Sequence, residues 1–332
     1  MVSWIEPHSH GIFVPPAGAW VDPGRAVDRA LVTHGHADHA RGGHARVLAT
    51  AETLAIMAAR YGPQPGGQAA KPHETVRVGE VDVRLVPAGH VLGSAQVVLE
   101  YRGERVVVSG DYKRGPDPTC APFEPVSCDV FVSEATFGLP VFRHPPVRAE
   151  VAKLLAARAA NPDRCVLVGA YALGKAQRLV AELRQAGFDA PVYLHGAMVR
   201  LFELYEALGV ALGDVRPVGT LKGEALKGAI IIAPPSALAD RWSRRLPEPI
   251  TAMASGWMRV RQRAKQRGVE LPLIISDHAD WDELTATIAE VRPGALWVTH
   301  GREEALVHWC GLRQQRARAL AMVGRDEEEI GE

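Results

Sequence analysis

The sequence predicts an α/β protein in which one domain is interrupted by another. Up to about residue 140 the chain consists of short β-rich runs and turns. Between 141 and 269, apolar runs of strand length alternate with helical runs, which is typical of a parallel sheet. After about residue 270 the chain again resembles its first part. We therefore expect a discontinuous domain, 1–140 plus 270–332, with an inserted α/β domain at 141–269.

Strands dominate the predicted discontinuous domain. Residues 81–86 alternate apolar and polar side chains, as a half-buried strand does. Two β-rich runs, 97–101 and 105–109, are separated by Arg102-Gly103-Glu104, which indicates a hairpin. The remaining elements expected here are strands over 129–133, 273–276 and 295–299, a helix over 281–291, and a frayed acidic tail over 326–332.

Helices and strands are predicted to alternate in the insert. The expected helices end where helix-stopping residues follow them, at Asn161-Pro162, Gly187 and Gly209. The expected helices cover 147–160, 174–186 and 197–208, and the expected strands cover 165–170, 192–194 and 229–233.

Composition excludes several broad classes. The 332 residues carry 38 basic and 38 acidic side chains, so any binding of a polyanion must come from a local patch. The four cysteines form no C-x-x-C pair, which argues against a zinc ribbon or redox motif and favours buried thiols. We see no signal peptide and no apolar run long enough to span a bilayer, so we expect a cytoplasmic protein.

The densest cluster of metal-binding residue types is Thr33-His34-Gly35-His36-Ala37-Asp38-His39, directly after the apolar residues 30–32. Imidazole nitrogens and carboxylate oxygens are the ligands that a borderline divalent metal prefers. On a tight turn, His34 and His36 can face one way while Asp38 and His39 face another, so two metals could lie side by side. The alternative is a polar loop that happens to be rich in histidine.

This motif closely resembles the signature of the metallo-β-lactamase fold, an αββα sandwich. Four further positions of that family are matched in order, at Asp22, His90, Asp111 and His300. The resemblance implies one metal bound by His34, His36, His90 and Asp111, and a second bound by Asp38, His39, Asp111 and His300. It also implies that Asp22 orients the metal-binding loop without binding metal. Zinc suits this nitrogen-rich set, with manganese as the other candidate.

The insert resembles the β-CASP branch of that fold. Ser133-Glu134-Ala135-Thr136-Phe137-Gly138 opens it, Ile275-Ser276-Asp277-His278-Ala279-Asp280 closes it, and the stretch from Tyr171 to Gln177 also matches. The resemblance suggests that Glu134 and His278 meet beside the metals, where a carboxylate would keep the imidazole protonated and able to donate a proton. We expect Asp38, Glu134 and His278 to be catalytic.

Substrate contacts are harder to predict. A basic run between Trp257 and Gly268 contains Arg259, Arg261 and Arg263 at alternate positions, which suits one edge of a strand that follows a phosphate backbone. A solvated charged face explains the same run equally well. Lys113 and the hydroxyl of Ser94 are two further candidate phosphate contacts.

The resemblance implies a nuclease that cleaves phosphodiesters by attack of a hydroxide shared between two metals, with His278 as the general acid. Overall size and layout are most similar to the bacterial DNA exonucleases associated with an ATP-dependent DNA ligase and a repair helicase, so we expect a DNA exonuclease of DNA repair. An RNA-processing nuclease is the near alternative, and a lactonase- or thioesterase-like hydrolase of small molecules is more remote. A binding protein without metals would need gaps in the ligand set, and the sequence shows none.

Overall fold

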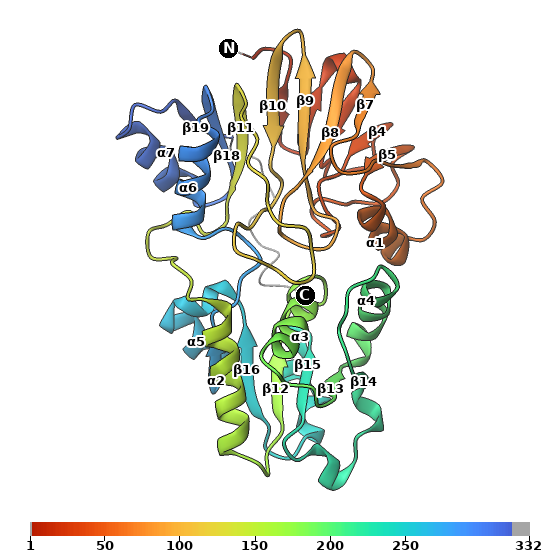
Figure 1. The fold of residues 1–332 in the computed structure, drawn as a ribbon, viewed down its shortest axis with the longest axis vertical. Coiled ribbons are helices and arrows are strands. Elements are labelled where there is room, and N and C mark those ends of the chain that lie inside the picture. Colours follow the sequence, from red (N-terminus) through yellow and green to blue (C-terminus); the bar gives the residue numbers. More distant parts are fainter. Residues whose placement is uncertain (1, 321–332) are drawn as a thin grey trace. The chain divides into compact units, whose positions relative to one another are not determined.

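The computed structural model describes residues 2–320 and separates into two compact units. Among the described residues, the first unit combines 2–143 with 278–320, and the inserted unit is His144–Asp277 (Figure 1). The insert thus begins at 144 where 141 was expected, and ends at 277 where 269 was expected. The acidic tail expected to fray at 326–332 lies outside the described residues.

Two sheets face each other in the first unit. One has the order β1-β2-β3-β4-β5-β6 and the other the order β19-β18-β11-β10-β9-β8-β7. Buried residues from both sheets, such as Val21, Leu31, Val97 and Val106, form one apolar cluster, so this cluster is the core of a sandwich. The strands are β1 (Glu6–His8), β2 (Gly11–Val14), β3 (Ala19–Val21), β4 (Arg29–Leu31), β5 (Arg46–Ala49), β6 (Gly67–Ala69), β7 (Thr75–Val78), β8 (Val81–Pro87), β9 (Ala95–Tyr101), β10 (Glu104–Val108), β11 (Val130–Ala135), β18 (Ala295–Gly301) and β19 (Ala317–Ala319).

Helices cover the outer face of each sheet. Met57 of α1 (Ala51–Tyr61) packs in a cluster with Val47 and Ala49 of β5. On the other sheet, α6 (Trp281–Val291) and α7 (Glu303–Gly311) contribute to a cluster that includes Phe131 and Val107. The layers therefore run helix, sheet, sheet, helix, as expected for the αββα sandwich (Figure 1).

The inserted unit is a parallel α/β layer. Its six strands have the order β14-β13-β15-β12-β16-β17, and every neighbouring pair is parallel. This confirms the parallel sheet predicted from the alternation of strands and helices. Its elements are α2 (Val147–Ala160), β12 (Val166–Gly169), α3 (Lys175–Gln185), β13 (Val192–Leu194), α4 (Gly196–Ala207), β14 (Val215–Pro217), β15 (Ile230–Ala233), β16 (Ile250–Ala254), α5 (Arg261–Arg267) and β17 (Leu271–Leu273).

Short 3₁₀ helices complete the described chain. One lies in the first unit and the others in the insert: η1 (Pro15–Ala17), η2 (Val218–Thr220), η3 (Gly223–Leu226), η4 (Pro235–Ala239), η5 (Ser243–Arg245) and η6 (Gly256–Arg259). Over the described part of the chain, no helix has both the length and the apolarity needed to cross a membrane.

The structure corrects three local expectations. The strand expected over 273–276 is wrong, because β17 ends at Leu273. The basic run is not a strand edge either: it lies on η6 and α5, since Arg, Gln, Ala and Lys are good helix formers and Gly268 ends the helix in a left-handed conformation. Finally, β11 extends to Ala135, so Glu134 lies within the strand.

Candidate metal centre

The histidine-rich loop follows β4, and Asp22 contacts it through hydrogen bonds. The Asp22 carboxylate is buried and accepts hydrogen bonds from the Thr33 backbone N–H at 2.8 Å and the Thr33 hydroxyl at 2.6 Å. Its Oδ2 also lies 2.7 Å from Nδ1 of His39. Asp22 has a φ of 44°, a left-handed conformation that aspartate tolerates better than most residues. The position expected to orient the loop therefore contacts both the backbone of the loop and one of its imidazoles.

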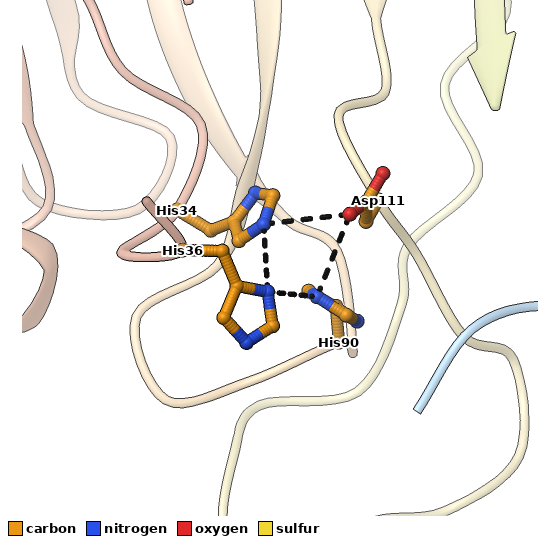
Figure 2. Close-up of side chains that lie close together, drawn as sticks. All are labelled: His34, His36, His90 and Asp111. Carbon is orange, nitrogen blue, oxygen red and sulfur yellow. Dashed lines mark hydrogen bonds and ion pairs between the residues drawn. The ribbon is translucent and has the colours of Figure 1, made fainter. Parts of the chain in front are cut away.

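Four of the predicted ligands converge on one point (Figure 2). Nδ1 of His36 lies 3.1 Å from Nε2 of His34 and 3.0 Å from Nε2 of His90. Oδ2 of Asp111 lies 3.5 Å from Nε2 of His34 and 3.7 Å from Nε2 of His90. Two ligands about 2.1 Å from one cation at the tetrahedral angle lie about 3.4 Å apart, so these separations suit a single bound zinc ion.

A second group adjoins the first through Asp111. Nε2 of His39 lies 3.2 Å from Oδ2 of Asp38 and 3.5 Å from Oδ2 of Asp111. His300 offers a ligand atom within 4.8 Å of those of His39 and Asp111, and its ring centroid is 5.1 Å from that of His39. Asp38 is grouped with His34 and His39. Asp111 thus lies in both groups, the position that a bridging carboxylate requires.

The hydrogen-bonding pattern of the rings fits a bound cation. Nδ1 of His39 faces Asp22, and Nδ1 of His34 lies 3.0 Å from the Thr33 hydroxyl, so both rings present Nε2 to the centre. Nε2 of His39 is buried and faces the carboxylates of Asp38 and Asp111. The contacts of Asp22 and Thr33 with the Nδ1 atoms fix the orientation and the tautomer of each ring.

Electrostatics at the centre also favour a cation. Burial, and then the neighbouring His39, His90 and His36 rings, lower the pKa of His34 well below its usual range, so its imidazole is neutral, as a metal ligand must be. Burial raises the pKa of Asp111 to about 7, with Glu134 and Asp38 adding to the effect and His39 and His278 opposing it.

The pKa of His39 shifts in the opposite direction to that of His34. Burial would lower it, but the carboxylates of Asp38, Asp111 and Asp22 outweigh burial and hold it well above the usual value. This part of the centre therefore attracts positive charge.

Glu134 and His278 form a pair beside Asp111. Glu134 is fully buried on β11, and its Oε1 accepts a hydrogen bond from the Tyr112 backbone N–H at 2.7 Å. Its Oε2 lies 2.9 Å from Nδ1 of His278, which in turn is 3.9 Å from Oδ2 of Asp111. The side chain of His278 is 12% exposed, and its ring centroid is 4.6 Å from that of His90. These two residues, 144 positions apart, therefore meet at the centre.

Three of the residues expected to contact substrate, Ser94, Lys113 and Arg263, have other partners within the protein. The hydroxyl oxygen of Ser94 accepts hydrogen bonds from the backbone N–H groups of His90 and Val91, which shapes the loop that carries His90. The ammonium of Lys113 donates to Glu283 at 2.7 Å. In the insert, Arg259 and Arg261 are exposed and the guanidinium of Arg263 lies over the ring of Trp257 at 3.8 Å. Their roles in substrate binding stay predictions.

Sequence reasoning overlooked two supporting residues, Thr33 and Glu283. The only sequence signal for Glu283 is its spacing from Asp280, the pattern of a capping box at the start of a helix, which the structure contains. The histidines set aside as surface or packing residues belong to none of the possible ligand groups within residues 2–320: His8, His10, His44, His73, His144, His195 and His308.

Comparison with known proteins agrees with this geometry. Residues 8–169 match the family model of the metallo-beta-lactamase superfamily. A probable DNA ligase of Opitutus terrae is 30% identical over 339 residues, which are 99% of this chain and 32% of that protein. A ribonuclease of Thermus thermophilus is 27% identical over 271 residues, covering 71% of this chain and 62% of the relative.

A solved structure supports the fold alone. It is a protein of unknown function from Enterococcus faecalis V583, with a TM-score of 0.57 and 15% identity, covering 90% of this chain and 80% of that one. The chain spans between about one third and three fifths of the length of the two curated relatives named above. The family match, these relatives and the layered fold together show that the chain contains a metallo-beta-lactamase superfamily domain and is related to nucleases of the β-CASP branch.

Proposed function

We propose that this chain is a metal-dependent phosphodiesterase that degrades DNA from an end during DNA repair. The proposal rests mainly on one observation: two ligand groups share Asp111, and Nδ1 of His278, which is paired with Glu134, lies 3.9 Å from Oδ2 of Asp111. A thioesterase expels a thiolate, which leaves without a proton donor, whereas the departing alkoxide of a phosphodiester needs one.

The residues present suit two divalent ions. His34, His36, His90 and Asp111 would hold one, and His39, Asp111 and His300 the other, together with Asp38, whose Oδ2 lies 3.2 Å from Nε2 of His39. When bound, such ions lower the pKa of water and neutralise charge that develops on the phosphate. The nitrogen-rich ligand set favours zinc, and manganese is the second candidate.

Three side chains would handle proton transfer and the positioning of water in the reaction: Glu134, His278 and Asp38. Glu134 contacts Nδ1 of His278, so the ring is oriented and its protonated form is stabilised. We expect Nε2 of His278 to give its proton to the leaving oxygen. Asp38, whose Oδ2 lies 3.2 Å from Nε2 of His39, would accept a hydrogen bond from the attacking water and orient it toward phosphorus.

The choice of DNA rests on the relative from Opitutus terrae. Nearly all of this chain aligns with one third of a protein named as a probable DNA ligase, so a segment of this kind is joined there to a much longer chain. A nuclease that trims ends and a ligase that joins them act on the same DNA. We therefore propose an ATP-dependent DNA ligase, together with a repair helicase, as partners. RNA processing is the second candidate function, because one relative is a ribonuclease of Thermus thermophilus.

The test compares wild-type protein with His278→Ala on end-labelled DNA and RNA of one sequence, single- and double-stranded, with zinc or manganese. His308→Ala on α7, an exposed histidine, is the matched control. We expect the wild type and the control to shorten DNA stepwise from an end, and His278→Ala to retain its metals but lose about 100-fold or more in rate. Cleavage of a thioester or lactone but no polynucleotide would reject a nuclease, and preference for RNA would select the second candidate.

A further inference from the structure

Two loops of the first unit meet beside the candidate metal centre. One follows Asp111, and the other runs from His278 to the start of α6. The Ala279 backbone N–H donates a hydrogen bond to the carbonyl of Tyr112 at 2.6 Å. The residues that follow Asp111 and His278 are therefore hydrogen-bonded to each other. The separation of the Asp111 and His278 side chains therefore depends on what holds these two loops together.

Glu283 binds both loops at once. Its Oε1 accepts a hydrogen bond from the Gly115 backbone N–H at 2.7 Å. Its Oε2 accepts one from the Lys113 ammonium at 2.7 Å and one from the Asp280 backbone N–H at 3.0 Å. Both oxygens of one carboxylate are thus used to join the loop after Asp111 to the first turn of α6.

Lys113 completes the connection. Besides Glu283, its ammonium donates to the backbone carbonyl of His278 at 3.3 Å. The side chains of Lys113 and Glu283 are 10% and 19% exposed, so water screens this ion pair weakly. Burial would raise the pKa of Glu283, but the Lys113 ammonium and the backbone N–H groups of Asp280 and Gly115 lower it.

We propose that Lys113 and Glu283 are positioning residues for the reaction, and that together they fix the backbone of His278 relative to Asp111. We call this pair the Lys113–Glu283 clasp. The kinetic part of the inference rests on the proposed function, in which His278 donates the proton. A phosphate contact by Lys113 is the competing role. Two of the three protons of the ammonium already point at Glu283 and the His278 carbonyl, which favours positioning.

The chain offers a matched control in the next residue. The guanidinium of Arg114 also ties this loop to α6, through Glu290 at 2.6 Å and Thr287 at 3.3 Å. Neither partner belongs to the loop of His278. Lys113→Met and Arg114→Met therefore remove the same charge and the same kind of tether, one beside His278 and one farther along the helix.

Steady-state cleavage of DNA separates the two roles. We expect Lys113→Met to lower kcat about tenfold to a hundredfold with KM within about twofold, since a small displacement of a reacting group costs rate rather than binding. Lys113→Arg should recover most of kcat, and Arg114→Met should match the wild type. Because the clasp acts as one unit, Glu283→Gln in the Lys113→Met background should lower kcat little further. A raised KM with unchanged kcat would assign Lys113 to phosphate binding and overturn the proposal.

A measurement that needs no substrate keeps the clasp testable if the proposed function fails. In protein labelled with ¹⁵N at histidine, the ring signal that disappears in His278→Ala belongs to His278. We expect that signal to shift in Lys113→Met and Glu283→Gln and to stay in place in Arg114→Met, with all variants retaining the far-ultraviolet circular dichroism of the wild type. An unchanged ring signal in Lys113→Met would reject the clasp, whereas absence of nuclease activity in the wild type would reject only the proposed function.

Discussion

Asp22 and His39 are joined by a 2.7 Å contact between Oδ2 and Nδ1, at the base of the histidine-rich loop. The same carboxylate also receives the backbone N–H and hydroxyl of Thr33. One buried side chain therefore fixes both the path of the loop and the orientation of an imidazole within it. The contact explains why an aspartate that binds no metal in the proposed ligand set matters to the centre.

Asp22→Asn should weaken metal binding without removing a ligand. An asparagine can still accept the Thr33 N–H, but its amide NH₂ would face Nδ1 of His39 and disturb the tautomer that presents Nε2. Loss of such a supporting contact typically lowers metal affinity by about 10- to 100-fold. Competition with a chromophoric chelator measures the affinity. Asp28→Asn is the control, because Asp28 is exposed and pairs with Arg46 at the surface; equal zinc affinities in the two variants would contradict the role given to Asp22.

A buried ion pair in the insert leads to a prediction about stability. Nζ of Lys175, at the start of α3, lies 3.1 Å from Oδ1 of Asp277, and both side chains are almost fully buried. Lys175→Met breaks this buried ion pair from one side and should cost about 3 kcal/mol of unfolding free energy. Chemical denaturation measures the loss. Adding Asp277→Asn should return part of it, so a double variant less stable than Lys175→Met would show that the pair is not coupled in this way.

The partly buried thiol of Cys128 leads to a prediction about alkaline pH. Burial, and then the neighbouring carboxylate of Asp129, raises the pKa of Cys128 to about 12. Because the folded pKa lies above the usual value near 9, the folded state keeps a proton that the unfolded chain loses. This contribution to stability is present below about pH 9 and is lost as the pH rises toward 12. Cys128→Ala should therefore flatten the fall in unfolding free energy between pH 9 and 11, and an unchanged slope would contradict the assignment.

Much of the candidate site could be predicted because its residues lie in short, dense motifs at the ends of strands. His34 to His39 are adjacent in sequence, and His90, Asp111 and His300 each follow or end a β-rich run. Composition and spacing alone reveal only the dense motif from His34 to His39, whereas the roles expected of His90, Asp111 and His300 follow from the family resemblance.

The supporting contacts could not be predicted in the same way. Lys113 and Glu283 are 170 positions apart, and Lys113 read alone resembles a phosphate contact as much as half of an ion pair. For the basic run around Arg261 the sequence left a strand edge and a solvated charged face equally open, and the run lies on a short helix, because alternate charges are compatible with both. Tertiary packing decides such cases, and one sequence does not contain it.

Gly35, between two of the predicted ligands, lies against α1. A Cβ placed there would be 2.6 Å from Cγ2 of Ile56, closer than such atoms approach one another. Ile56 is fully buried on α1, so it has little room to move away. Gly35→Ala should therefore displace His34 and His36 and lower zinc affinity at the first group. Ile56→Ala removes the obstructing methyl, and in the double variant it should restore the affinity despite its own cost to stability of about 2 to 5 kcal/mol. Titration with zinc and thermal unfolding separate the two effects; if Gly35→Ala binds zinc as the wild type does, the requirement for glycine at this position lies elsewhere than in its contact with the helix.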